Sequence, residues 1–189
     1  MLFKDYIKNV NSTIEALDEK PISDLIKLLH KAYIEDKMVF VIGNGGSAAN
    51  ASHFAQDLAK GTRKDTEQPK RIKALSLTDN LPFITALGND DGYDTIFEQQ
   101  LRTFAKDGDI LICISGSGNS PNIIKAASWA KTNKLIIVGI TGFDGGKLMK
   151  LSNYSIHVPV NDMYISESIH SIIFHYVLVE LNKIFYKGM

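Results

Sequence analysis

Residues 109–122, DILICISGSGNSPN, form the stretch around which the rest of the chain is organised. Its first six residues are mostly apolar with branched side chains, and glycines flank the run. Such a run is typical of a buried parallel strand. Pro121 suits the first turn of a helix, and Ser120 suits the N-cap position before it. The stretch therefore predicts a strand, a loop of small residues and a helix, in that order.

The loop itself, residues 115–120, has the composition of an anion site. Backbone N–H groups and the helix dipole favour negative charge at a helix N-terminus, and the hydroxyl groups of Ser115, Ser117 and Ser120 add donors. The loop has neither the lysine of a P-loop nor the spacing of a dinucleotide fingerprint. An ordinary strand-to-helix turn is the alternative, and we predict a phosphate site.

The composition argues against several classes of protein. The 189 residues are 44% hydrophobic and 22% charged, which is ordinary for one globular domain. The formal net charge is +0 and no stripe of Lys and Arg stands out, which argues against direct nucleic-acid binding. The single cysteine, Cys113, lies in the predicted strand, so no disulfide framework is expected. Without a membrane-length apolar run or a secretory N-terminus, we expect a cytoplasmic protein with no membrane partner.

Apolar runs recur along the chain, mostly with helical patterns between them. We predict five strands, at residues 37–42, 72–77, 109–114, 134–140 and 154–158. Strands that alternate with helices indicate an α/β fold with a doubly wound parallel sheet flanked by helices. Right-handed crossovers place the loops that follow the strands at one edge of the sheet, where such folds bind ligands. The short last strand is expected at the side of the sheet.

The first 35 residues are predicted to form two helices. We therefore divide a single domain, residues 1–189, into an N-terminal helical pair, 1–35, and an α/β core, 36–189. Apolar residues of the first helix recur at helical spacing, namely Phe3, Ile7, Val10 and Ile14. This stripe is more hydrophobic than a solvated arm requires, so we expect it to pack against its own domain or a neighbouring subunit.

A second strand–loop–helix site is predicted after the first strand. The segment GNGGS, residues 43–47, leads into a helix over residues 48–60. Its glycines permit positive φ angles and close approach of the backbone to a ligand. Ser47 is expected to cap the helix and to present its hydroxyl and N–H to an anion. A turn is predicted further along the chain, at residues 88–92, between two helices.

Two helices carry histidine and carboxylate side chains at helical spacing. His53 and Asp57 are four residues apart, so they project from one face of a helix. Such a pair can bind a metal ion, but it can also make an ordinary hydrogen bond. In the long last helix, Glu167, His170 and His175 lie among apolar residues and need partners. Hydrogen-bonded core histidines are the alternative to metal ligands there.

Together these segments resemble the sugar isomerase (SIS) domain family, and most of all its phosphoheptose isomerases. The resemblance rests on GNGGSAANASHFAQDL, LGNDDGYDTIFEQQL, ISGSGNSPNIIKA, TGFDGGKL and ESIHSIIFHYVLVEL, in this order. It extends from about residue 36 to residue 182 and implies the flavodoxin-like SIS fold. It also implies a homotetramer with active sites between subunits.

The resemblance further implies a reaction and a set of site residues. The reaction is isomerisation of sedoheptulose 7-phosphate to D-glycero-D-manno-heptose 7-phosphate, the first step toward the heptose of the lipopolysaccharide core. By position, the residues that would hold a zinc ion are His53, Asp57, Glu167 and His175. Those that would hold the phosphate are Ser115, Gly116, Ser117 and Ser120. Those that would contact the sugar are Asn44, Gly45, Gly46, Ser47, Asp57, Asp90 and Glu167.

The chain departs from the family's usual pattern at several positions. Asp57 replaces a Glu and Glu167 replaces a Gln, so the predicted site carries an additional formal charge. Gly116 replaces a Thr, Tyr164 replaces an Asp, and Gly61 stands where the family often has an Arg. The sugar end is altered more than the phosphate end, so the choice of sugar phosphate stays open.

Aldose–ketose exchange through an enediol needs a base beside the carbonyl and an acid for its oxygen. Asp57 is the candidate base by position, and His175 is the candidate acid. Glu167 is the alternative base, because coordination to zinc would lower the basicity of Asp57. A phosphosugar-binding regulator of the same fold, such as a relative that binds a replication initiator, is the main alternative to an enzyme. The histidines and carboxylates together favour the enzyme, and an isomerase for another sugar phosphate is the second alternative.

Overall fold

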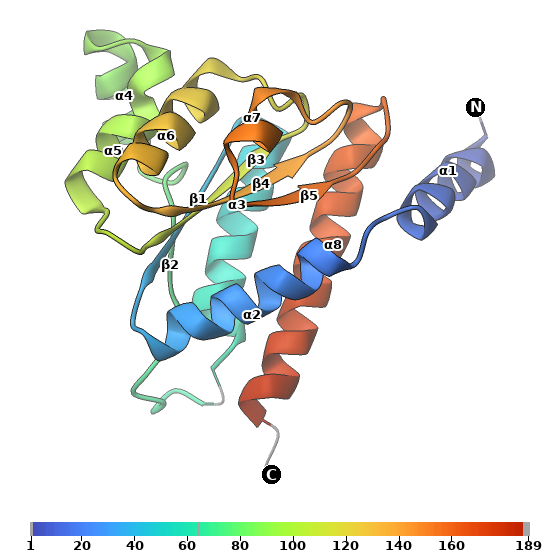
Figure 1. The fold of residues 1–189 in the computed structure, drawn as a ribbon, viewed down its shortest axis with the longest axis horizontal. Coiled ribbons are helices and arrows are strands. Elements are labelled where there is room, and N and C mark those ends of the chain that lie inside the picture. Colours follow the sequence, from blue (N-terminus) through green and yellow to red (C-terminus); the bar gives the residue numbers. More distant parts are fainter. Residues whose placement is uncertain (1, 64, 187–189) are drawn as a thin grey trace.

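The computed structural model describes residues 2–63 and 65–186, and it contains a parallel sheet with helices on both faces (Figure 1). The strands are β1 (Met38–Gly43), β2 (Lys73–Ser76), β3 (Ile110–Ser115), β4 (Ile136–Thr141) and β5 (Tyr154–His157). They form a five-stranded sheet in the order β2-β1-β3-β4-β5, and every neighbouring pair is parallel. The predicted fold class and the side position of the last strand are confirmed.

Helices bury both faces of this sheet. One face packs against α2 (Lys20–Ile34), α3 (Gly46–Gln56) and α8 (Met163–Tyr186). The other packs against α5 (Ile96–Phe104), α6 (Pro121–Thr132) and α7 (Gly146–Leu151), with α4 (Leu81–Asp90) at the margin. The three inner strands, β1, β3 and β4, are largely apolar because alternate side chains enter the two layers. In β3, Ile112 faces the first layer, whereas Leu111 and Cys113 face the second.

The first helix, α1 (Phe3–Glu15), is less integrated than α2. Figure 1 shows it extending away from the sheet, beyond the N-terminal end of α8. Val10 is buried, but Phe3 is 77% exposed and Ile7 is 39% exposed. The predicted apolar stripe is therefore only partly covered within one chain.

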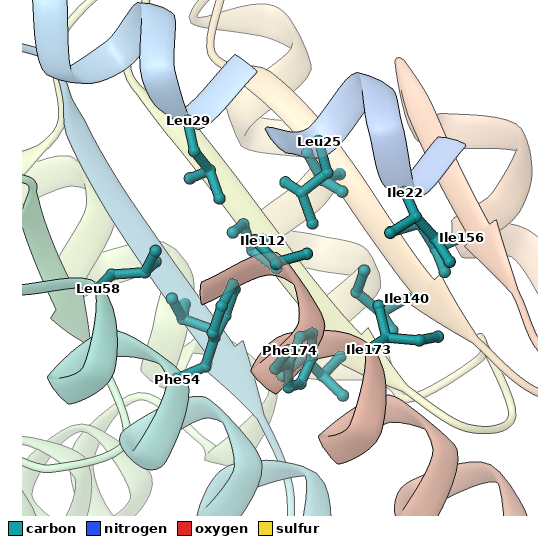
Figure 2. Close-up of a cluster of buried hydrophobic side chains, with 14 of the residues drawn as sticks. Ile22, Leu25, Leu29, Phe54, Leu58, Ile112, Ile140, Ile156, Ile173 and Phe174 are labelled. Atoms are coloured by element: carbon teal, nitrogen blue, oxygen red, sulfur yellow. The ribbon is translucent and has the colours of Figure 1, made fainter. Parts of the chain in front are cut away.

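Helices α3 and α8 are held together by stacked aromatic rings. The ring centroids of Phe54 and Phe174 are 4.3 Å apart, and the ring planes are inclined by only 14°. Figure 2 shows these rings among buried side chains of the sheet and the surrounding helices, including Leu58, Ile112 and Ile173. This packing fixes the position of each helix relative to the other, which matters for the polar residues that both carry.

The strands differ from the predicted ranges by one or two residues at their ends, and two other segments differ more. The helix expected over residues 48–60 begins at Gly46 and gives way to a π-helical turn at Asp57–Gly61. Hydrophobic spacing does not distinguish a π turn from an α turn over so short a segment. The turn expected at residues 88–92 is partly wrong, because α4 continues through Gly88 to Asp90 and a 3₁₀ turn follows at Tyr93–Thr95. Asn80 caps α4 by accepting the N–H of Phe83, which stabilises a helix that contains a glycine.

Among the residues that the structure describes, no helix combines the length and the apolar character needed to span a bilayer.

Candidate functional site

The polar loops that follow β1 and β3 lie next to each other at one edge of the sheet. These strands are neighbours, and the order of strands along the chain reverses between them. Ligands of open α/β sheets bind at such a switch point, outside the carboxyl ends of the strands. We name the loop after β1, residues 43–47, the glycine loop, and the loop after β3, residues 115–120, the serine loop.

The serine loop is tightly folded around its own hydroxyl groups. Ser115 is buried, and its Oγ donates to Ser120 Oγ at 3.4 Å. Ser117 Oγ accepts the backbone N–H of Asn119 at 3.3 Å. Ser120 is the N-cap residue of α6 as predicted, with Pro121 in the first turn, although its side chain makes no capping hydrogen bond. The predicted strand, loop and helix N-terminus are therefore present and brought together.

Two glycines let the serine loop pack closely. Gly118 has φ +63°, and a side chain there would overlap the backbone of Gly145, whose loop precedes α7. A Cβ at Gly116 would overlap the sulfur of Met163, which lies at the start of α8. Met163 thus occupies the space that a side chain at position 116 would need.

The glycine loop starts α3 in a different way from the one predicted. The N-cap residue is Gly45, which has a positive φ of +55°, and the helix begins at Gly46. Ser47 therefore lies in the first turn and does not cap the helix, which corrects the prediction. Its side chain is buried, and its Oγ donates to Glu167 Oε1 at 3.3 Å.

Asn44 makes contacts that the sequence did not reveal. Its side-chain amide exchanges two hydrogen bonds of 2.9 Å with the amide of Asn122, in the first turn of α6. The hydroxyl of Tyr93 donates to Asn44 Oδ1 at 3.1 Å. Asn122 and Tyr93 were not among the predicted site residues. The only available signal was the position of Asn122 two residues after the predicted N-cap.

Glu167 joins α8 to the glycine loop. Its carboxylate faces Gly46 and Ser47 at the N-terminus of α3, where the helix dipole favours negative charge. Its backbone carbonyl accepts a hydrogen bond of 3.1 Å from Asn50 Nδ2. Glu167 therefore lies beside the predicted sugar-contacting loop.

Three other predicted ligands converge farther along the same two helices. His53 Nε2 is 3.3 Å from Asp57 Oδ2, and His175 Nε2 is 4.0 Å from the same oxygen. The two imidazole rings meet edge to face with centroids 5.2 Å apart. One ligand atom from each residue lies within 4.8 Å of the others, so the group could hold a metal ion. We name these three residues the His–Asp–His group.

The donors of this group suit zinc. Two imidazoles and one carboxylate are a common protein ligand set for Zn²⁺ and leave a fourth position open, as catalytic sites do. The Asp57 side chain is 24% exposed and the two histidines are more than half exposed, so the group is accessible to solvent. Asp57 also begins the π-helical turn, a feature that is frequent at functional sites.

The His–Asp–His group and the strand-end loops lie apart within one chain. With a rise of about 1.5 Å per residue, His53 and Asp57 lie roughly 10–16 Å along the helix from Gly46. By the same measure, His175 is about 12 Å from Glu167, so Glu167 is separated from the other three predicted ligands. Asp90, the last residue of α4, is exposed and accepts a hydrogen bond from Asn89 at 2.7 Å.

One histidine of α8 belongs to the core instead. His170 is fully buried, and its Nε2 is 3.3 Å from the carbonyl oxygen of Thr141 at the end of β4. Burial lowers the pKa of His170 to about 4, so the imidazole is neutral near pH 7. Burial likewise raises the pKa of the Cys113 thiol, as expected for a core residue. The alternative reading of a core histidine therefore holds for His170.

Comparisons with known proteins agree with this fold. The SIS domain family matches residues 3–142. A phosphoheptose isomerase from Aliarcobacter butzleri is 35% identical over 95% of this chain and 92% of its own length. Another, from Clostridium acetobutylicum, is 36% identical over 92% of both. The structure of a phosphoheptose isomerase from Neisseria gonorrhoeae superposes with a TM-score of 0.86 and 29% identity, covering 96% of this chain and 95% of the other.

The chain therefore belongs to the SIS domain family. Within that family it is similar to phosphoheptose isomerases along nearly its full length.

Proposed function

We propose that the chain is a phosphoheptose isomerase, which interconverts sedoheptulose 7-phosphate and D-glycero-D-manno-heptose 7-phosphate. The observation that carries the proposal is the His–Asp–His group, which α3, the π turn after it and α8 bring together. A protein that only binds phosphosugars has no evident need for these ligands. The similarity to phosphoheptose isomerases supports this choice among sugar phosphates.

In this proposal the serine loop holds the phosphate. Ser115, Gly116, Ser117 and Ser120 surround the N-terminus of α6, where backbone N–H groups and the helix dipole favour an anion. The sugar extends toward the glycine loop, where Asn44, Gly45, Gly46 and Ser47 contact it together with Asp90 and Glu167. The adjacency of the two loops at the switch point supports this arrangement.

Zinc is the proposed cofactor. His53, Asp57 and His175 would hold it. Glu167, the fourth ligand that the family resemblance implies, lies about 12 Å along α8 from His175 in the same chain and is not counted among these three. When bound, the ion supplies Lewis-acid polarisation of the carbonyl and hydroxyl oxygens of the sugar.

The proton transfers are assigned to side chains of the same group. Asp57 removes the proton from the carbon beside the carbonyl, and His175 protonates the carbonyl oxygen, which gives the enediol. Transfer of this proton to the former carbonyl carbon then gives the aldose, because the hydroxyl on the deprotonated carbon loses its own proton and becomes the new carbonyl. Glu167 is the second candidate base, because its carboxylate lies beside the glycine loop and outside the His–Asp–His group.

The proposed site is shared between the subunits of a homotetramer. The separation of roughly 10–16 Å between the His–Asp–His group and the glycine loop of one chain supports sharing, because a ligand held by one chain's loops can then meet a neighbour's histidines. The exposed apolar residues of α1 and α8 support assembly.

The test is turnover of sedoheptulose 7-phosphate with product identification, for wild type, Asp57→Asn and Glu167→Gln. Loss of a general base should lower the rate by about 10²–10⁴-fold while phosphate binding survives. Asp57→Glu, which restores the family's usual residue, should retain or improve activity. If only Glu167→Gln abolishes turnover, the chain is still an isomerase, but Glu167 is the base. Binding without turnover in the wild type and in Asp57→Glu would support a regulator instead.

A further inference from the structure

We propose that Asn122 is a positioning residue that fixes the side-chain amide of Asn44. In this orientation Asn44 offers a ligand one N–H donor and no acceptor. The inference rests on the proposed function in one respect, namely that Asn44 faces a bound sugar phosphate. The hydrogen bonds that carry it involve Asn122, Tyr93 and the backbone of Ile123, which the proposed chemistry does not use.

A backbone group sets the orientation of Asn122. The N–H of Ile123 donates to Asn122 Oδ1 at 2.9 Å. Because a backbone N–H can only donate, the side-chain atom that it meets must be the oxygen of the amide. Asn122 is 2% exposed, so its side chain has no solvent-facing alternative. The other end of the amide is then necessarily the NH₂ group.

The orientation of the Asn122 amide determines that of the Asn44 amide. Asn44 Nδ2 donates to Asn122 Oδ1, and Asn122 Nδ2 donates to Asn44 Oδ1, both at 2.9 Å. A flipped Asn44 would place two oxygens and two NH₂ groups face to face. Asn44 is therefore held in one of its two amide orientations.

A hydrogen bond from Tyr93 shows which groups of the Asn44 amide remain for a ligand. Its hydroxyl donates to Asn44 Oδ1 at 3.1 Å, so this oxygen accepts from both Tyr93 and Asn122 and its two lone pairs are used. Among the residues that the structure describes, Asn44 Nδ2 donates only to Asn122, which uses one of its two N–H groups. The remaining N–H can pair with an acceptor such as a carbonyl, hydroxyl or phosphate oxygen.

This arrangement has two consequences for binding. Asn44 lies in the glycine loop and Asn122 in the first turn of α6, so the paired amides couple the glycine loop to the serine loop. A ligand that spans both loops meets a preorganised donor and does not have to order it on binding. Without Asn122, the Asn44 amide could rotate and present its oxygen to the ligand.

A double-mutant cycle tests the role of Asn122. Binding of sedoheptulose 7-phosphate is measured by calorimetry for wild type, Asn44→Ala, Asn122→Ala and the double variant. We expect Asn122→Ala to weaken binding on the order of tenfold in the wild-type background and hardly at all in the Asn44→Ala background. Equal weakening in both backgrounds would show that Asn122 does not act through Asn44. Asn133→Ala, at the opposite end of α6, is the matched control and should leave binding unchanged.

Amide exchange tests the inference without a ligand, so the test does not depend on a variant that still binds the sugar phosphate. Tyr93→Phe removes the hydroxyl that donates to Asn44 Oδ1 and should weaken binding about two- to fivefold. In the wild type, one side-chain amide proton of Asn44, assigned by its loss in Asn44→Ala, should exchange slowly with solvent. Asn122→Ala should make both protons exchange fast. Fast exchange of both protons in the wild type would overturn the inference, whether or not the sugar phosphate binds.

The same measurements separate this inference from the proposed function. A wild type that binds without turnover contradicts the isomerase but leaves the cycle and the exchange experiment interpretable. If the wild type turns over and the effects of Asn44→Ala and Asn122→Ala on binding simply add, only the role of Asn122 is contradicted.

Discussion

The hydroxyl of Ser117 differs from those of Ser115 and Ser120, which hydrogen-bond to each other across the serine loop. Ser117 Oγ accepts the N–H of Asn119, and a hydroxyl that accepts can still donate its own proton. Ser117 is also only partly buried, so its proton can reach a phosphate oxygen.

Replacing Ser117 with Ala should therefore weaken binding of a phosphosugar by about 1–3 kcal/mol, the usual effect of losing a hydrogen bond to a charged group. Calorimetric titration checks this value. Ser128→Ala, an exposed serine farther along α6, is the matched control. Equal weakening for the non-phosphorylated sugar would mean that the loop does not recognise phosphate.

His170 makes the stability of the fold depend on pH. Its folded pKa of about 4 lies below the ordinary value of 6.5, so the unfolded chain takes up a proton that the folded chain resists. His157, on β5, contributes to this lowering of the pKa. The free energy of unfolding should thus fall by roughly 3 kcal/mol as the pH decreases from 6.5 to 4.

Chemical denaturation over this pH range, at fixed protein concentration, measures the effect. His170→Gln removes the titrating group, so its unfolding free energy should fall less steeply. His30→Gln, on α2, keeps His170 and should retain the wild-type slope. A His170→Gln variant with the same slope as the wild type would assign the effect to other groups.

At the scale of elements, the stacked rings of Phe54 and Phe174 hold α3 against α8. The His–Asp–His group uses this contact, since two of its members lie on or just after α3 and the third lies on α8. Neither helix alone provides three ligand atoms within 4.8 Å of one another. A metal bound there would therefore depend on the packing of two helices.

Protein purified without chelators should contain zinc or a similar divalent ion, and His53→Ala combined with His175→Ala should remove it. The remaining carboxylate gives too few ligands for a tight site. Elemental analysis measures the content, and His30→Ala is the control histidine variant. A metal content that the double change leaves intact would place any bound ion elsewhere.

At the scale of the whole molecule, apolar surface remains uncovered along α1 and α8. The exposed side chains include Phe3, Ile7, Ile172, Tyr176 and Val179. A groove of about 740 Å³ runs between the N-terminal helices and α8, lined by residues such as Leu17, Ile26 and Ile173. Contiguous apolar surface of this kind marks interaction sites between proteins.

The family resemblance implies a tetramer, so we expect a particle about four times the 20.9 kDa mass of the chain. The apolar surface on two helices favours burial by further copies. Light scattering at micromolar concentration measures it. Ile172→Glu with Val179→Glu should dissociate the assembly, because charge would be buried in the contact. Leu81→Glu, at a more exposed apolar position on α4, should not. A monomeric wild type would also remove the support for a shared site.

The sequence by itself determined the α/β fold and the position of both loops. Strands that are apolar throughout, such as 110–115, reveal burial on two faces, and the glycine, serine and proline residues that follow them have local conformational preferences. Because apolar runs and turn residues are local features, they predict strands and loops without knowledge of which residues meet in the folded chain. The exceptions were also local in origin: the extension of α4 through Gly88 and the π turn at Asp57 change few residues and leave the hydrophobic spacing intact.

Only the tertiary structure decided which polar side chains meet. Asn44 and Asn122 are 78 residues apart, and Ser47 and Glu167 are 120 apart, so no spacing in the sequence could pair them. The histidines show the same limit: His170 and His175 share one helix, but one turns into the core and the other toward Asp57. The physical reason is that a hydrogen bond or a metal ligand set depends on distances of a few ångströms between elements, which the packing of α3, α6 and α8 against the sheet determines.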